Sequence, residues 1–207
     1  RWASHWLDIA RFAESSGGGR TLPFKDAWRY RDYVIESIRE NVPLDRFITE
    51  QVAGDLLPYA SAAERRRNLT ATGLLVLGAT NYEEQDKGLL RMDIVDEQLE
   101  LIGKSFLGMT IGCARCHDHK FDPIPIKDYY AMAGILRSTK VIKDPKENVA
   151  HWIDYPLPMD EPHESAMQAK EARLVKLRQE LDDAKRAAKK AGVAAALENL
   201  QPGALMP

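Results

Sequence analysis

Apolar residues recur every three to four positions through the first two thirds of the chain, the spacing of one face of an α-helix. The opening segment shows this with Trp2, Trp6, Ile9 and Ala13. We predict further helices after Asp26, from Pro43, from Ser61 to about Gly78, from about Glu83 to Leu107 and from about Ile126 to Arg137. No alternation of apolar and polar residues is long enough to form a sheet, so the pattern predicts an all-α fold.

Two of these helices carry recognisable start signals. Pro43 suits the first turn of its helix, and Ser61 with Glu64 forms a capping box. For the helix that starts at Pro43, we expect an inward face made of Leu44, Phe47, Ile48, Val52 and Leu56. Between the first two helices, the run from Gly17 to Gly19 predicts a mobile loop.

The composition of the chain changes twice. We predict a helical domain over residues 1–142, a proline-rich irregular linker over 143–163, and a helical spacer or coiled-coil segment over 164–207. In the last part an a/d stripe consists of Met167, Leu174, Leu177, Leu181, Ala184, Ala188 and Ala191. The stripe predicts an extended C-terminal amphipathic helix, which either packs on its own domain or mediates self-association. Because alanine side chains are small, the stripe would bury little apolar surface between two helices, and we therefore expect no strong dimer.

The charge balance excludes some classes of function. The 207 residues carry a formal net charge of -2, which does not favour nucleic acid as a partner. No apolar run approaches the roughly 20 residues needed to span a bilayer. The chain begins with Arg1 and its first residues lack the apolar block of a signal peptide. We therefore expect an internal fragment or a processed product from which any export signal is missing.

The two cysteines of the chain lie in one motif, Cys113-Ala114-Arg115-Cys116-His117. Two cysteines so close together cannot form a disulfide that crosslinks distant segments of the chain. We therefore expect them to have a local role, in binding or in redox chemistry. The spacing C-x-x-C-H is that of a c-type haem attachment site. Thiols three positions apart can each bond one vinyl group of one haem, and His117 can then bind the iron as proximal ligand. Gly112 and Ala114 are small enough to let the chain approach a porphyrin closely.

Three other interpretations of the motif stay open. A zinc site would use Cys113, Cys116, His117 and His119, but four ligands within seven residues would be cramped. A dithiol redox motif belongs in a βαβ setting that this helical sequence does not show. The third alternative is a pair of free structural cysteines.

An electron-transfer haem generally has a second axial ligand. The candidates are His5, His151, His163 and the six methionines. We rank His5 first, on the opening helix between Trp2 and Trp6, although a packed or surface histidine there is the simpler interpretation. An open sixth position would favour peroxidase-like or gas-binding chemistry. We expect His119 to hydrogen-bond locally or to meet a haem propionate, and the acidic run from Asp93 to Glu100 to be a solvated helix face.

The segment CARCHDHKFDPIPIKDYYAMAGIL, from Cys113 to Leu136, resembles the second planctomycete-type cytochrome c-like domain, a family first catalogued as a domain of unknown function. The blocks RWASHWLDIARFAESSG, AWRYRDYVIESI and RMDIVDEQLELIGKSFLGMTIG agree in the same order, so the resemblance covers roughly residues 1 to 140. The family's pattern includes the histidine of the HWLD block, here His5, and the run from His119 to Pro123. The resemblance implies a part of a large exported protein with further domains on either side.

Together these observations predict a c-type cytochrome domain with one covalent haem c on Cys113, Cys116 and His117. We expect a periplasmic or otherwise extracytoplasmic location, because covalent haem attachment takes place outside the cytoplasm. The partners would be a redox protein or adjoining domains of the same parent chain. The main alternative is a haem enzyme domain with an open distal site, and a structural zinc or thiol scaffold is the other.

Overall fold

A computed structural model describes residues 1–143, 148–159 and 161–190. Within these residues the chain forms seven α-helices, and its only extended pairings are two isolated bridges, between Ser15 and Pro23 and between Ile142 and Trp152. The predicted all-α fold is therefore confirmed. Contacts divide the chain into two units, Arg1–Pro158 and Met159–Pro207.

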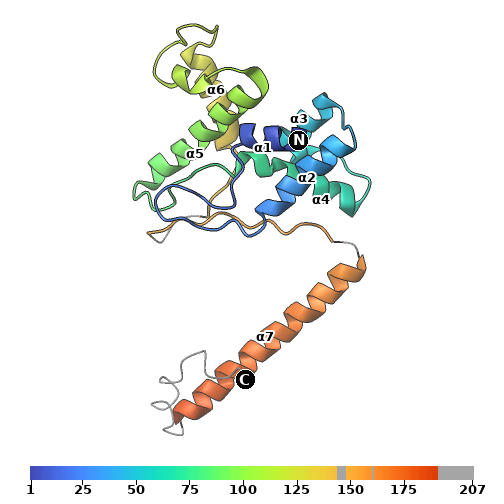
Figure 1. Cartoon of the computed structure of the whole chain (residues 1–207). Coiled ribbons are helices and arrows are strands. Elements are labelled where there is room, and N and C mark those ends of the chain that lie inside the picture. The colour runs from blue at the N-terminus through green and yellow to red at the C-terminus, as the bar shows by residue number, and fades with distance from the viewer. Residues whose placement is uncertain (144–147, 160, 191–207) are drawn as a thin grey trace. The chain divides into compact units, whose positions relative to one another are not determined.

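The first unit holds six of the helices (Figure 1). They are α1 (Trp2–Ile9), α2 (Ala27–Arg39), α3 (Leu44–Ala53), α4 (Ala62–Ala71), α5 (Lys87–Ile102) and α6 (Ile126–Arg137). Short 3₁₀ turns follow α3 at Gly54–Leu56 and α4 at Thr72–Leu75, and a third precedes α6 at Ile111–Arg115. Helices α1 to α4 pack against one another, and α5 packs along α6.

Three groups of buried apolar residues hold these helices together. The largest lies among α1 to α4 and includes Tyr30, Val34, Phe47 and Leu74. A second lies between α5 and α6 and consists of Val95, Leu99, Ile111, Ala114, Tyr129 and Ala133. The third joins α5 to the segment after α6. The 3₁₀ turn at Ile111–Arg115 contributes two residues to the second group, so the C-x-x-C-H motif is built onto the α5–α6 core.

Helix α3 turns a different face inward from the one we predicted. Phe47 is buried, but Leu44 and Leu56 are 67% and 80% exposed, and the other buried residues of α3 are Glu50 and Gln51. Polar burial is tolerated because both side chains are satisfied. Glu50 accepts hydrogen bonds from the Tyr33 hydroxyl at 2.9 Å and the Arg46 guanidinium at 2.7 Å. Gln51 accepts from the Tyr30 hydroxyl at 2.6 Å and from Trp6 at 3.1 Å.

Helix α5 begins and ends at defined capping residues. The Asp86 carboxylate accepts from the backbone N–H groups of Gly88 at 2.9 Å and Leu89 at 3.0 Å. At its C-terminal end α5 widens into a π-helical turn, Gly103–Leu107, which ends at Gly108 with φ +67°. A left-handed residue of this kind suits glycine. The predicted helix from about Glu83 to Leu107 is thus shorter, and the chain leaves it through a π turn that leads into the motif.

The glycine-rich segment after α1 folds back as a closed turn. The Ser16 N–H donates to the Leu22 carbonyl at 2.9 Å, and the Thr80 N–H donates to the Ser16 carbonyl at 2.8 Å. Gly19 has φ +57°, and a Cβ there would lie 2.2 Å from the Asn81 side-chain oxygen. The glycines therefore permit close packing on the residues that precede α5.

The segment that we predicted as a linker contributes to the first unit up to Pro158. The Ala150 N–H donates to the Tyr82 carbonyl at 2.8 Å, and the Arg66 guanidinium donates to the Pro158 carbonyl at 2.9 Å. The Trp152 ring packs edge-on against Phe24 and Tyr82. Residues 148–158 are thus irregular in backbone conformation but packed, and residues 144–147 lie outside the described part of the chain.

The second unit contains α7 (Glu161–Lys190). Its stripe residues Leu174, Leu177 and Leu181 are exposed, at 54%, 49% and 53%. The side chains of Met167 and Ala188, and the whole of Ala191 with the rest of the chain to residue 207, lie outside what the structure describes. Self-association through this stripe stays a prediction. Among the described helices none combines the length and the apolar character that crossing a membrane requires.

Candidate functional site

The C-x-x-C-H motif folds as a 3₁₀ turn, Ile111–Arg115, followed by Cys116 in a helical conformation. In a 3₁₀ helix, side chains three positions apart eclipse one another. Ile111 and Ala114 accordingly point the same way and are buried, at 2% and 0% exposed. Cys113 and Cys116 are also three positions apart, with Cys116 directly after the turn, and both are exposed free thiols. The turn therefore buries Ile111 and Ala114, while both cysteines are exposed to solvent.

Helix α5 holds the motif through two carboxylates. Glu100 accepts a hydrogen bond from the Gly112 backbone N–H at 2.9 Å. Asp96 accepts from the Arg115 guanidinium at 3.0 Å and, through its other oxygen, from the Tyr129 hydroxyl at 2.7 Å. Asp96 thus joins the motif to α5 and α6 at one point. The Asp96 charge raises the pKa of Arg115, and burial, followed by the hydrogen bond to Asp96, raises the pKa of Tyr129.

The small residues of the motif have a packing explanation. Ala114 is completely buried in the α5–α6 core, where a larger side chain has no room. A Cβ on Gly112 would lie 3.0 Å from the Glu100 carboxylate oxygen that accepts its N–H. We expected these two residues to be small so that a porphyrin could approach. Their contacts within the fold account for their size without a cofactor.

His117 is exposed, and its ring orientation is fixed by its neighbour. The Nδ1 atom lies 2.8 Å from the Asp118 carbonyl oxygen. A carbonyl can only accept, so Nδ1 carries the proton and donates it. The lone pair of the imidazole is then on Nε2, which is the atom left to bind a metal. Iron- and zinc-binding histidines commonly show this arrangement, in which the nitrogen that does not bind the metal donates to a backbone carbonyl.

His119 has the opposite tautomer and a buried side chain, 5% exposed. Its Nδ1 accepts from the backbone N–H groups of Phe121 at 3.2 Å and Asp122 at 2.8 Å. The proton is therefore on Nε2, which lies 3.1 Å from the Thr110 hydroxyl oxygen and donates to it. Both ring nitrogens are engaged, in agreement with the local hydrogen bonding that we expected. His119 is thus not free to complete a zinc site.

The loop between the motif and α6 is closed by Asp118. Its carboxylate accepts from the Ile126 backbone N–H at 2.8 Å, at the first residue of α6. The Tyr130 hydroxyl, from the next turn of α6, donates to the Arg115 carbonyl at 3.1 Å. The residues HDHKFDP therefore form a folded support for the motif. Throughout the described residues, no group of three or more histidine, cysteine, aspartate or glutamate side chains is arranged to hold a metal ion.

The structure leaves the candidates for a second iron ligand as predictions. His5 is exposed on α1, with its ring 5.9 Å from that of Trp2 in an edge-on contact. One residue further along, Trp6 stacks on Phe106 of the π turn at 5.9 Å, so α1 contacts the segment that leads to the motif. Met132 packs against the core under the motif. The His151 backbone carbonyl accepts from Lys143, and the side chain of His163 lies outside the described part.

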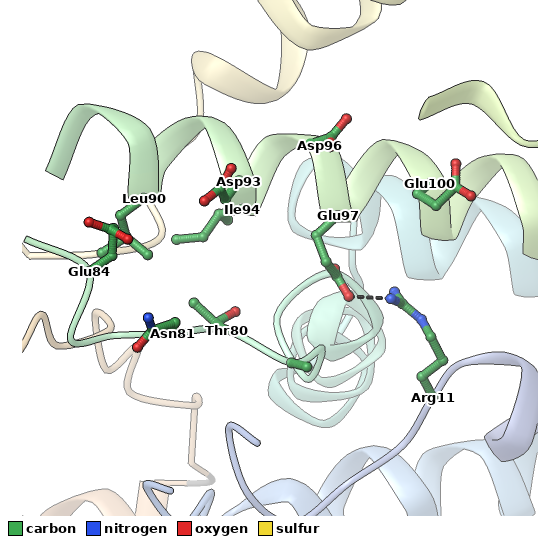
Figure 2. Close-up of a pocket in the computed structure, with 11 residues that line it drawn as sticks. Arg11, Thr80, Asn81, Glu84, Leu90, Asp93, Ile94, Asp96, Glu97 and Glu100 are labelled. Atoms are coloured by element: carbon green, nitrogen blue, oxygen red, sulfur yellow. Dashed lines mark ion pairs between the residues drawn. The ribbon is translucent and has the colours of Figure 1, made fainter. Parts of the chain in front are cut away.

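A cavity of about 420 Å³ lies beside α5 (Figure 2). Its lining includes five carboxylates, those of Glu84, Asp93, Asp96, Glu97 and Glu100. In Figure 2, Glu97 points into the cavity toward Arg11, with which it forms an ion pair. The acidic run is therefore partly a cavity wall instead of the fully solvated face that we expected. Negative charges would repel haem propionates, so this cavity does not suit a haem.

These features define a small all-α domain with two exposed thiols and one oriented, exposed imidazole in and just after a supported 3₁₀ turn. The model of the family PSCyt2, described as a protein of unknown function (DUF1549), matches residues 1–141. The chain therefore belongs to this family. No curated protein and no solved structure matches the chain.

Proposed function

We propose that this chain is a c-type cytochrome domain that carries one covalent haem and transfers electrons within a larger exported protein. Cys113 and Cys116 would hold the haem through thioether bonds, and His117 would bind its iron. When bound, the haem supplies one-electron redox chemistry at its iron. The observation that carries the proposal is the His117 ring, whose Nδ1–H donates to the Asp118 carbonyl and leaves Nε2 for iron.

The donor set of the motif fits a haem better than it fits zinc. Both thiols are free and exposed and lie three positions apart, Cys113 within the 3₁₀ turn and Cys116 directly after it, the sequence spacing that attachment to one ring requires. Zinc needs four ligands, and His119 is already committed to Thr110 and the backbone. The segments that flank the motif also expose apolar side chains, with Leu107 55%, Tyr130 52% and Phe121 84% exposed. An apolar cofactor face or a partner would reduce this exposure.

The residues around the motif would keep the imidazole and the sulfurs in place. Asp96 and Glu100 fix the turn from α5, and Asp118 fixes the following loop to α6. These contacts hold the motif rigid before any cofactor arrives. A preorganised ligand environment lets an iron change charge with little structural rearrangement.

The test is expression of the chain with a cytochrome c maturation system, followed by denaturing electrophoresis, haem staining and mass spectrometry. We expect a haem-sized mass increase that survives denaturation. The variant in which Cys113→Ala and Cys116→Ala are combined should lose it, and Asp154→Asn, an exposed acidic position remote in sequence, should keep it. Bare polypeptide from the wild-type chain, or zinc bound in place of haem, would refute the proposal.

The visible spectrum of the haem form tests the second axial ligand. A low-spin spectrum that becomes high-spin in His5→Ala, but not in His151→Ala, would identify His5 as that ligand. A wild-type high-spin spectrum that shifts with carbon monoxide would show an open site and favour the enzyme alternative. Because c-type attachment takes place outside the cytoplasm, the proposal also implies an extracytoplasmic location. The electron donor or acceptor would be a redox protein or an adjoining domain of the parent chain.

A further inference from the structure

The two thiols of the motif have different surroundings, although both are exposed. The Cys113 sulfur lies 3.6 Å from the Thr110 hydroxyl oxygen, and the Cys113 N–H donates to the Thr110 carbonyl at 3.1 Å. Cys116 lies beyond the end of the 3₁₀ turn. For the part of the chain that is described, no side-chain hydrogen bond to the Cys116 sulfur is found. The turn therefore places a hydroxyl beside one sulfur and not beside the other.

The direction of the hydrogen bonds follows from His119. Its Nδ1 accepts two backbone N–H groups, so its Nε2 must carry the proton and donate to the Thr110 oxygen. This leaves the hydroxyl proton of Thr110 free to turn toward another acceptor. While Cys113 is a thiol, its S–H donates to the Thr110 oxygen. A thiolate can only accept, and the Thr110 proton is then within reach to be donated to it.

We propose that Thr110 makes Cys113 the more nucleophilic of the two thiols, and that His119 is a positioning residue that holds Thr110 in this role. A cysteine attacks through its charged sulfur, and the Thr110 hydroxyl, 3.6 Å from the Cys113 sulfur, can donate a hydrogen bond to that charge. The buried ring of His119 cannot turn away without losing both bonds to the backbone. The hydroxyl is thus held where the charge on the sulfur develops.

The same difference has a consequence for haem attachment, and this part of the inference rests on the proposed function. Cys113 forms its thioether bond before Cys116 does. Each thiol adds across a vinyl double bond: one sulfur–carbon bond forms, and the thiol hydrogen ends on the neighbouring carbon. The addition loses no atom and consumes no oxidant. The faster thiol therefore decides which bond anchors the ring first.

The test uses the reduced full chain without haem and iodoacetamide as the probe. In this reaction a sulfur–carbon bond forms as the carbon–iodine bond breaks, and iodide leaves. The rates for Cys113 and Cys116 are followed by mass spectrometry of the two labelled sites, with Cys116→Ser and Cys113→Ser as single-thiol references. We expect Cys113 to react about two-fold faster, because the effect of one hydrogen bond of ordinary strength is partly offset by the lower nucleophilicity of the hydrogen-bonded sulfur.

Two variants of Thr110 separate activation from support of the fold. Thr110→Val removes the hydroxyl at nearly constant volume and should slow Cys113 to the rate of Cys116. Thr110→Ser keeps the hydroxyl and should keep the fast rate. A merely structural role would instead open the turn in Thr110→Val and raise both rates together. His119→Ala should slow Cys113 selectively, in the same direction as Thr110→Val.

Equal rates for the two wild-type thiols, or a Cys113 rate unchanged in Thr110→Val, would overturn this inference. Failure of covalent haem attachment in the maturation experiment would refute the proposed function while leaving the difference in alkylation rates intact. Equal alkylation rates with normal haem attachment would refute only the role of Thr110 and His119.

Discussion

Asp96→Asn tests whether the motif is held by a single carboxylate of α5. Asn is neutral, so neither the bond from the Tyr129 hydroxyl, now at 2.7 Å, nor the bond from the Arg115 guanidinium, now at 3.0 Å, stays charge-assisted. The ion pair with Arg115 is about one-third exposed and therefore worth only ~0.5 kcal/mol. Tyr129 is fully buried, and its charge-assisted bond is worth ~1.5 kcal/mol. Because a neutral hydrogen bond remains possible, we expect unfolding of the first unit to become easier by about 1 kcal/mol, less than the sum of the two contributions.

The assay is urea unfolding of the chain without haem, followed by tryptophan fluorescence. All four tryptophans lie in the first unit, so the signal reports that unit. Tyr129→Phe should cost ~1.5 kcal/mol, and Tyr130→Phe, which removes a half-exposed hydroxyl, should cost well under 1 kcal/mol. The losses of Asp96→Asn and Tyr129→Phe should not add in the double variant. Additive losses, or a loss below ~0.5 kcal/mol for Asp96→Asn, would show that Asp96 does not link the motif to α6.

Three further outcomes follow from buried groups and from the backbone. Glu50→Ala should cost ~3 kcal/mol in urea unfolding, because it leaves Tyr33 and two arginines without their buried carboxylate; a loss below ~1 kcal/mol would contradict this. Burial raises the pKa of the Tyr33 and Tyr129 phenols above their ordinary value, so the folded state favours the neutral form. Stability should be full below pH ~10 and fall as the pH rises further, and phenolate absorbance should appear at higher pH in the folded chain than in urea; coincident titrations would refute the reasoning. Gly108→Ala should destabilise by ~1 kcal/mol, because φ is +67° although nothing lies within 4 Å of the added Cβ. Its matched control, Gly134→Ala inside α6, has equal space and a helical backbone and should stabilise by ~0.5 kcal/mol in the same thermal melts; the same sign for both would refute the backbone argument.

The helices and the motif could be predicted from the sequence because both depend on local spacing. The helical spacing of the apolar residues, with a period of about 3.6, identified most of the helices. The predicted cap at Ser61 also forms, because the Ser61 hydroxyl accepts from the Glu64 N–H at 3.1 Å. The C-x-x-C-H spacing identified Cys113, Cys116 and His117 as candidates, and their role as haem ligands stays a prediction; the structure shows all three exposed.

The inward face of α3 could not be predicted in the same way. The pattern assigns burial to apolar residues, and it placed Leu44 and Leu56 inside. The actual choice depends on partners far along the chain, because Glu50 and Gln51 can be buried only when Tyr33, Tyr30 and Trp6 reach them. Spacing within one helix contains no information about such partners.

The supports of the motif were missed for a related reason. Asp96 and Glu100 are two carboxylates in a charged stretch of α5, and nothing local distinguishes them from a solvated helix face. Their roles appear only when the π turn brings the motif back beside α5. The His119 tautomer depends likewise on the loop closing so that Phe121 and Asp122 direct their N–H groups at one ring nitrogen.

The π turn at Gly103–Leu107 makes the spacing between α5 and the motif unusually strict. A π turn is equivalent to one extra residue inserted into an α-helix. Deleting a single residue there would remove the wide turn, and the Met109 N–H could no longer donate to the Gly103 carbonyl, as it now does at 3.0 Å. The motif would then lose its position beside Glu100 and Asp96, which bond Gly112 and Arg115. Length variation among relatives should therefore be tolerated in the glycine turn before α2 sooner than in these five residues.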